Sequence, residues 1–168
     1  EPVDFPRWNR RPLVRWVRRV SLATWILPLA RIFVWIQVSG LEHLKGVRGP
    51  VVFAANHQSH LDWVLIWAAL PKDLRSKTRP IAAKDYWTSS PFKHWITREV
   101  FNAVYVARQR TDDQDPLEPL AEALKQGDSL VIFPEGTRSN KGDPQTFKSG
   151  LYHLAEQFPD VQLVPAWI

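Results

Sequence analysis

The sequence predicts an α/β fold, a mixed, largely parallel sheet flanked by helices, with an N-terminal amphipathic helical arm that binds a membrane. Short apolar runs bounded by turn residues alternate with longer helical patterns, which is the order that builds a parallel sheet. The 168 residues, 45% of them hydrophobic, suffice for one domain with its own core. Basic residues gather at the start, and the net charge of +5 lies entirely within residues 1–40.

A basic helix is predicted over residues 12–20. Its apolar residues Leu13, Trp16, Val17 and Val20 have helical spacing and share one face, while arginines fill the other. A basic helix with Trp on its apolar side is typical of a segment that lies among lipid headgroups. The alternative is a surface helix packed on its own domain. Nucleic acid is not an expected partner, because no reading motif accompanies the arginines.

The apolar segment that follows, residues 20–38, is too interrupted for a membrane span. Pro28 and Arg31 break it, and its charge-free stretch of 11 residues is short of the about 20 that a transmembrane helix needs. We therefore expect residues 1–32 to form basic, Trp-rich helices at a membrane interface. Residues 33–168 are expected to form the folded domain.

The first half of this domain is predicted to supply three strands and a buried helix. Residues 33–38 alternate and are rich in β-branched side chains, which predicts a strand. Residues 51–55 and 80–83 are short apolar runs of the kind found in buried strands. Residues 61–70 are apolar and end before Pro71, which favours a buried helix.

The second half continues the alternation of helices and strands. Residues 116–126 carry acidic residues early, Lys125 late and Gly127 as a stop, which is the charge order of a helix. The remaining elements that the sequence predicts are helices over 87–97 and 147–157, and strands over 103–107, 130–133 and 161–164.

Chemistry is predicted where the strand 51–55 ends and the next helix begins. His57 lies in this junction, and Asp62 lies in the first turn of the helix. The carboxyl ends of strands are where α/β active sites form. Asp62 can accept the imidazole Nδ1–H and leave Nε2 as a base that removes a proton from a substrate hydroxyl.

Two other interpretations of this stretch stay open. Ser59 can cap the helix with Asp62 at its third position, in which case Asp62 only supports the helix end. His57, His60 and Asp62 can instead be metal ligands, although the change from loop to helix falls between the two histidines. The chain has no Cys, so disulfides, thiolate zinc sites and cysteine nucleophiles are excluded.

A second polar turn, residues 133–139, follows another predicted strand. A proline and a glycine favour a tight turn that presents Glu135, Thr137 and Arg138 together. Arg138 can grip a phosphate with two N–H groups, and Thr137 can add a hydroxyl. Glu135 is expected to hold the arginine or a substrate hydroxyl in place. The alternative is a surface turn with a Glu–Arg pair.

Further basic side chains follow a third strand. Arg108 and Arg110 come directly after residues 103–107. Because arginines follow two strand ends and a histidine follows another, the sequence predicts an anion pocket at this edge of the sheet. The alternative is a solvated basic turn.

These blocks resemble those of the glycerolipid acyltransferase family, in particular its 1-acylglycerol-3-phosphate acyltransferases. Residues 56–62 are similar to the family's His-x₄-Asp block, and residues 133–139 to its Phe-Pro-Glu-Gly-Thr-Arg-Ser block. Residues 105–108 and 164–166 are similar to its intervening and last blocks. The four blocks occur in family order, and the resemblance covers about residues 33–168.

The resemblance implies transfer of a fatty acyl group from acyl-CoA or acyl carrier protein to the free hydroxyl of a lysophospholipid. Lysophosphatidic acid, giving phosphatidic acid, is the first expectation. His57 would be the general base and Asp62 its orienter, with no covalent acyl-enzyme. No metal is implied, and no cofactor beyond the acyl donor. The residues that would build the acceptor's phosphate site are Arg108, Glu135, Gly136, Thr137 and Arg138.

The chain departs from the family pattern at two places. Ala107 stands where an acidic residue usually precedes the arginine of the intervening block. The family also continues past its last block, so we expect part of the sheet or of an acyl tunnel to lie outside these 168 residues.

The resemblance also covers location and alternatives. A two-helix membrane-binding motif is typical of the family's N-terminal region, so we expect association with the cytoplasmic face of a membrane. Two alternative functions stay open. One is an acyltransferase for another lysophospholipid or glycerol-3-phosphate, and the other is a catalytically silent membrane-binding module.

Overall fold

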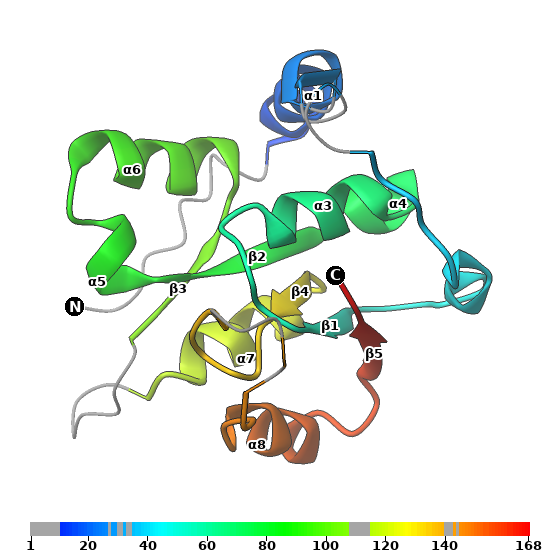
Figure 1. Ribbon diagram of the computed structural model, residues 1–168, viewed down its shortest axis with the longest axis vertical. Coiled ribbons are helices and arrows are strands. Elements are labelled where there is room, and N and C mark those ends of the chain that lie inside the picture. Colours follow the sequence, from blue (N-terminus) through cyan, green and yellow to red (C-terminus); the bar gives the residue numbers. More distant parts are fainter. Residues whose placement is uncertain are drawn as a thin grey trace.

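A five-stranded parallel sheet forms the centre of the molecule (Figure 1). The computed structural model describes residues 11–26, 28–29, 32, 35–107, 115–139, 143 and 145–168. The strand order is β3-β2-β4-β1-β5, and all four neighbouring pairs run parallel, so the described sheet is fully parallel rather than mixed. The strands are β1 (Val51–Ala55), β2 (Thr78–Ala83), β3 (Val104–Val106), β4 (Ser129–Ile132) and β5 (Gln162–Ala166).

Helices cover both faces of this sheet, and α1 lies beyond α3 on one of them (Figure 1). The α-helices are α1 (Pro12–Ser21), α3 (Asp62–Ala69), α4 (Lys72–Arg75), α5 (Lys84–Trp87), α6 (Pro91–Trp95), α7 (Glu118–Lys125) and α8 (Gly150–Gln157). Two π-helical turns, η2 (Leu22–Ile26) and η4 (Ile96–Val100), and a 3₁₀ turn, η3 (Leu41–Leu44), complete the described elements.

The core lies in two layers because successive strand residues point to opposite faces. Val52 and Leu130 face α7 and α8, where they pack with Leu124 and Leu154. The other face packs against α3, and its buried residues are Val51, Phe53, Ala55, Ile66, Leu70 and Val131. Each fully buried aliphatic side chain stabilises the fold by roughly 1.5–3 kcal/mol, so both layers anchor the central strands.

The connections after β1 and β4 leave the sheet on opposite faces. The chain passes from β1 through α3 to β2, and from β4 through α8 to β5, with α3 and α8 in different core layers. β1 and β4 are themselves neighbours, with Phe53 beside Val131. Their carboxyl ends therefore open a crevice, which is where ligands bind in open α/β sheets.

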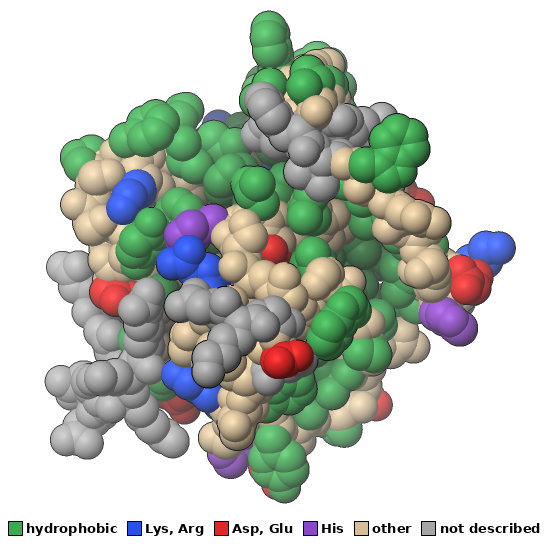
Figure 2. Space-filling model, in the orientation of Figure 1, with side chains coloured by type: hydrophobic (Ala, Val, Ile, Leu, Met, Phe, Trp, Pro, Cys, Tyr) green, Lys and Arg blue, Asp and Glu red, His purple; other side chains and the backbone are tan. Residues whose placement is uncertain are grey.

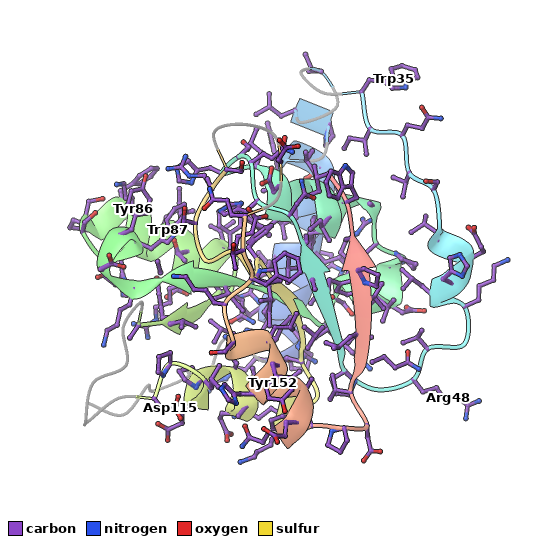
Figure 3. All side chains as sticks on the ribbon, turned by 60° about the horizontal axis from the view of Figure 1, so that its bottom comes forward. Trp35, Arg48, Tyr86, Trp87, Asp115 and Tyr152 are labelled. Carbon is purple, nitrogen blue, oxygen red and sulfur yellow. The ribbon has the colours of Figure 1, made fainter. Side chains whose placement is uncertain are left out.

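Two predicted elements differ from the structure. Residues 35–38 form no strand, and Trp35 is 94% exposed and points away from the sheet (Figure 3). The described strands pair only with one another, and this segment joins neither the β3 nor the β5 edge of the sheet. The helix predicted over 87–97 is broken at residues 88–90, because Pro91 starts a new helix capped by the Ser90 hydroxyl.

The helix predicted over 12–20 is confirmed as α1, and it shows parts of both interpretations. Its apolar stripe is exposed, with Leu13 and Trp16 at 70% and 59%. The helix is nevertheless tied to the domain: Arg18 donates two hydrogen bonds of 3.2 Å to the Glu99 carbonyl, and Leu22 is buried against Trp67. Burial, and the nearby Arg79, lower the pKa of Arg18. Within the described residues, no helix combines the length and apolarity of a membrane span.

Candidate active site

The site forms at the carboxyl ends of β1 and β4. Asn56 and His57 follow β1 directly, and Phe133 follows β4. The His57 ring stacks on Phe133, with ring centroids 4.0 Å apart and planes 18° apart. The His57 side chain is 20% exposed and lines a pocket. Stacking therefore fixes the ring plane while one edge of the imidazole faces the pocket.

Asp62 gathers three hydrogen bonds on one carboxylate oxygen. Its Oδ2 lies 2.9 Å from His57 Nδ1 and accepts the backbone N–H groups of Gln58 at 2.6 Å and Ser59 at 2.7 Å. A carboxylate can only accept, so this contact places the proton on Nδ1 and leaves Nε2 as the basic nitrogen. The predicted meeting of His57 and Asp62 is confirmed, and their catalytic roles stay predictions.

The capping interpretation is confirmed in one bond, since Asp62 Oδ2 accepts the Ser59 N–H at 2.7 Å, and is wrong in the helix positions. Asp62 is the first residue of α3, not the third position after a Ser59 cap. Ser59 Oγ instead accepts the Leu61 N–H at 3.2 Å. The Asp62 side chain is 2% exposed, so the helix start is built around a buried carboxylate that also holds the imidazole.

The backbone of His57 is held from both sides by the turn after β4. Its N–H donates to Glu135 Oε1 at 2.9 Å, and its carbonyl accepts the Ser139 N–H at 2.7 Å. Glu135 Oε2 accepts the Gln145 N–H, also at 2.9 Å. Glu135 is 2% exposed. Its buried carboxylate therefore joins the loop after β1 to the turn after β4. This position differs from a contact with substrate phosphate, the role that the family resemblance implied for it.

The rest of the turn is exposed and basic. Gly136 adopts φ +69°, a left-handed conformation that favours glycine. A side chain there would lie 2.9–3.0 Å from the Lys148 side chain, so Lys148 lies directly against the turn. Thr137 and Arg138 are exposed beside it. Lys148 was missed because it lies 10 residues beyond Arg138, in a segment without a motif.

Electrostatics place Arg138 near the histidines. Burial lowers the pKa of His60, and the positive charge of Arg138, followed by His57 and Lys93, lowers it further. Arg138 and His60 come from different loops, so this electrostatic interaction indicates that the two loops lie near each other at this edge of the sheet. Of the predicted phosphate-site residues, Thr137 and Arg138 lie at this edge, and Arg108 lies outside the described residues.

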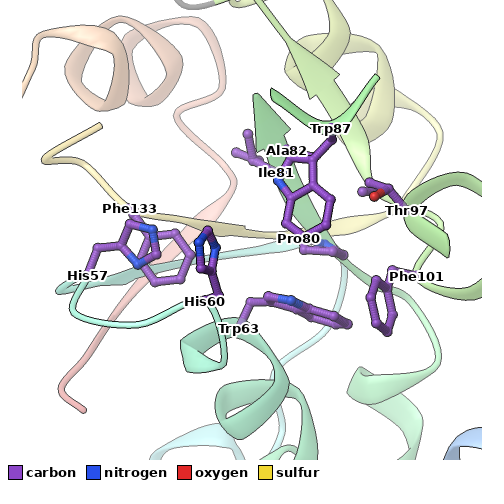
Figure 4. Close-up of a pocket in the computed structure, with 11 residues that line it drawn as sticks. His57, His60, Trp63, Pro80, Ile81, Ala82, Trp87, Thr97, Phe101 and Phe133 are labelled. Atoms are coloured by element: carbon purple, nitrogen blue, oxygen red, sulfur yellow. The ribbon is translucent and has the colours of Figure 1, made fainter. Parts of the chain in front are cut away.

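A largely apolar pocket opens beside His57 (Figure 4). His57 and Phe133 lie at one end, and Phe101 and Thr97 lie at the other, with Trp63 between them. Trp63 and Phe101 meet edge to face, with centroids 4.4 Å apart. The remaining lining residues are His60, Pro80, Ile81, Ala82, Trp87 and Ala103. Such a lining suits a hydrocarbon chain better than a polar ligand.

The metal interpretation finds no support in this arrangement. In the parts of the chain that the structure describes, no three His, Asp or Glu side chains converge as a metal site would require. The His60 ring turns toward Tyr86, on which it stacks with centroids 5.6 Å apart. Its proposed co-ligand Asp62 is already committed to His57 and two backbone N–H groups.

Comparison with known proteins agrees with the arrangement of these blocks. A family model described as Acyltransferase matches residues 35–168. The chain belongs to the glycerolipid acyltransferase family. In this family context, the loop 56–62 and the turn 133–139 are the two blocks that the structure joins through Glu135 and Ser139.

Relatives in the family carry related names. The chain is 33% identical over 134 residues to 1-acyl-sn-glycerol-3-phosphate acyltransferase alpha of Homo sapiens, covering 77% of this chain and 44% of that protein. It is 34% identical over 136 residues to the chloroplastic enzyme LPAT1 of Arabidopsis thaliana, covering 79% and 35%. It is 28% identical over 150 residues to lysocardiolipin acyltransferase 1 of Mus musculus, covering 82% and 39%. The chain thus spans less than half the length of these relatives.

The fold also matches a solved acyltransferase. The 1-acyl-sn-glycerophosphate (LPA) acyltransferase PlsC from Thermotoga maritima superposes with a TM-score of 0.58 and 25% sequence identity. The match covers 86% of this chain and 52% of PlsC. The parallel α/β sheet described above is therefore an acyltransferase-family architecture.

Proposed function

We propose that this protein transfers a fatty acyl group from an acyl thioester, acyl-CoA or acyl carrier protein, to the free hydroxyl of a lysophospholipid. Lysophosphatidic acid, giving phosphatidic acid, is the proposed acceptor. The observation that carries the proposal is the His57–Asp62 pair beside a basic turn. Family membership and the names of the relatives support the reaction class.

The proposed chemistry is a direct transfer with His57 as base. Nε2 takes the proton of the acceptor hydroxyl as its oxygen attacks the thioester carbonyl carbon, and Asp62 stabilises the imidazolium that forms. The tetrahedral intermediate then expels the thiolate, which takes the proton back from His57. One C–O bond forms, one C–S bond breaks, and His57 ends in its starting state.

The basic turn provides the selectivity for a phosphate-bearing acceptor in this proposal. Arg138 can bind phosphate through two N–H groups, and Lys148 adds a second cation beside Gly136. In this proposal the apolar side chains that line the pocket next to His57 contact the hydrocarbon part of a substrate. Phosphate recognition on one side and an apolar chain on the other orient the hydroxyl toward Nε2.

The proposal includes a membrane location, at the cytoplasmic face. A lysophospholipid acceptor resides in the bilayer, whereas the thioester donor is carried in water. The exposed Leu13, Trp16 and Val17 on the basic helix α1 suit a segment lying in the interface. An enzyme resting on the membrane through α1 reaches both substrates.

A panel of acceptors tests this proposal. The 168-residue chain is incubated with acyl-CoA or acyl carrier protein donors and with lysophosphatidate, lysophosphatidylcholine, lysocardiolipin or glycerol-3-phosphate, and products are identified by mass spectrometry. We expect phosphatidate from lysophosphatidate to form fastest. Preference for another acceptor would reassign the substrate. No product from any pair, both with these 168 residues and with the natural protein that contains them, would contradict the enzyme proposal and favour a silent membrane-binding module.

A further inference from the structure

The short helix α6 exposes two aromatic rings that have no function in the site described above. Phe92 is 69% exposed and Trp95 is 55% exposed. They lie three residues apart on one face of the helix, and their rings stack with centroids 6.4 Å apart. Neighbouring exposed large aromatic side chains mark interaction surfaces.

This aromatic pair is structurally continuous with α1. The helix α6 runs directly into η4, whose Glu99 carbonyl accepts two hydrogen bonds from Arg18 of α1. Leu22, just after α1, packs in one cluster with Trp67 and the partly buried Phe101. Figure 1 shows α6 and α1 along the upper edge of the molecule, and Figure 2, in the same orientation, shows hydrophobic side chains along that edge.

The charges around the pair favour an anionic surface. Lys93 lies between Phe92 and Trp95 in sequence, and its ammonium sits over the Tyr86 ring, 4.1 Å from the centroid. On α1 the arginines Arg15 and Arg19 are exposed next to the apolar stripe. Aromatic rings and basic groups together are what proteins place at the headgroup level of a membrane.

We propose that Phe92 and Trp95 form a second lipid-contacting surface, which binds the same anionic bilayer as α1. Trp87 and Thr97, which flank α6 in sequence, line the pocket beside His57. Contact at α6 therefore holds this part of the pocket near the lipid, from which a bilayer-resident acceptor enters. This last consequence rests on the proposed function, whereas the lipid contact itself does not.

Site-specific labels measure the contact directly, because the chain contains no Cys. Single cysteines replace Phe92, Leu13 on α1 and, as a matched control, Tyr152, a 64% exposed aromatic residue on α8. Each cysteine carries an environment-sensitive fluorophore. The proteins are mixed with phosphatidylcholine vesicles with or without phosphatidylglycerol. We expect labels at 92 and 13 to shift to the blue with phosphatidylglycerol vesicles, and the label at 152 to stay unchanged.

Each other outcome overturns the proposal in a distinct way. A water-like label at 92 with a shifted label at 13 would show that α1 binds lipid without α6, which leaves the proposed function intact. Water-like labels at both positions would overturn lipid contact altogether, and acyl transfer measured on the same samples reports separately on the enzyme proposal. A shift at 92 without vesicles that grows with protein concentration would identify a second copy of the chain as the occupant.

Replacing the two aromatic rings with acidic side chains gives a second measurement. The double variant Phe92→Glu, Trp95→Glu should lower vesicle binding by about tenfold or more, because two aromatic rings no longer enter the interface. Tyr152→Glu should bind like the wild type. All three side chains are exposed, so circular dichroism should report an unchanged fold. Wild-type vesicle binding by the double variant would overturn the proposal.

Discussion

Asp62 is the residue on which the geometry of the site depends most. Its Oδ2 accepts hydrogen bonds from His57 Nδ1 and from two backbone N–H groups, and the side chain is 2% exposed. The two backbone N–H groups keep the carboxylate in place, and the carboxylate in turn orients the imidazole. A charge-assisted bond in a buried site contributes about 1.5–3 kcal/mol, so this oxygen both shapes the loop and orients the base.

Asp62→Asn should lower kcat by roughly 10²- to 10⁴-fold, since a neutral amide no longer stabilises the imidazolium. The variant should also lose about 1–3 kcal/mol of unfolding free energy, because it weakens the bonds to Gln58 and Ser59. Steady-state transfer assays and urea titration measure the two effects. The exposed Asp160→Asn serves as the control, and a wild-type kcat in Asp62→Asn would remove the orienting role.

The pKa of His60 reports on how close Arg138 lies to the histidines. Its pKa lies below the ordinary value of 6.5, first because of burial and second because of Arg138. The neutral form is therefore favoured in the folded state, and the corresponding stability is lost as the pH falls below about 6.5 toward the folded pKa.

Arg138→Gln should raise the pKa of His60 without bringing it above 6.5, because the burial contribution remains. The midpoint of the His60 ring signals in a proton NMR titration measures it. Arg48→Gln is the matched control, since Arg48 lies on the opposite side of the molecule from Tyr86, the ring on which His60 stacks (Figure 3). An unchanged midpoint in Arg138→Gln would place the guanidinium away from the histidines.

At the scale of elements, the turn after β4 acts as a support for the loop after β1. Glu135 spans the two, with one carboxylate oxygen on the His57 N–H and the other on the Gln145 N–H. A glutamine has only one acceptor oxygen, so its amide group would face one of these donors. The buried position leaves little room for water to compensate.

Glu135→Gln should therefore destabilise the protein by about 1–3 kcal/mol and lower kcat more than it raises the KM for lysophosphatidate. Glu42→Gln, at an exposed glutamate, should change stability by less than about 0.5 kcal/mol. Urea titration and transfer kinetics compare the two. Wild-type stability in Glu135→Gln would contradict the tie between the loops.

The elements that sequence reasoning predicted best are those with a strong local signal. The apolar runs of β1 and β4 and the charge order of α7 are all found in the structure. Residues 35–38 show the limit of local patterns. Their alternation is typical of a strand, but a strand forms only when the segment pairs with a neighbour, and these residues do not join the sheet. The proximity of Lys148 to Gly136 depends on a turn between distant residues, and no spacing rule predicts it.

For the molecule as a whole, sheet order turns separate blocks into one site. β1 and β4 are 78 residues apart at the Val52–Leu130 pair, yet they are neighbours in the sheet. Sequence reasoning placed both blocks at strand ends but did not predict that these strands are adjacent. α1 and α6 lie along one edge of the molecule (Figure 1), and Trp87 and Thr97, on either side of α6 in sequence, line the pocket beside His57.

The central claim is that His57 is the base of an acyl transfer, and one assay tests it most directly. Phosphatidate formed from acyl-CoA and lysophosphatidate is quantified for the wild type, His57→Ala and His153→Ala, the last at a half-exposed histidine on α8. We predict wild-type rates for His153→Ala and a loss of at least roughly 10²-fold for His57→Ala, with both variants folded. Turnover by His57→Ala at the rate of His153→Ala would contradict the account.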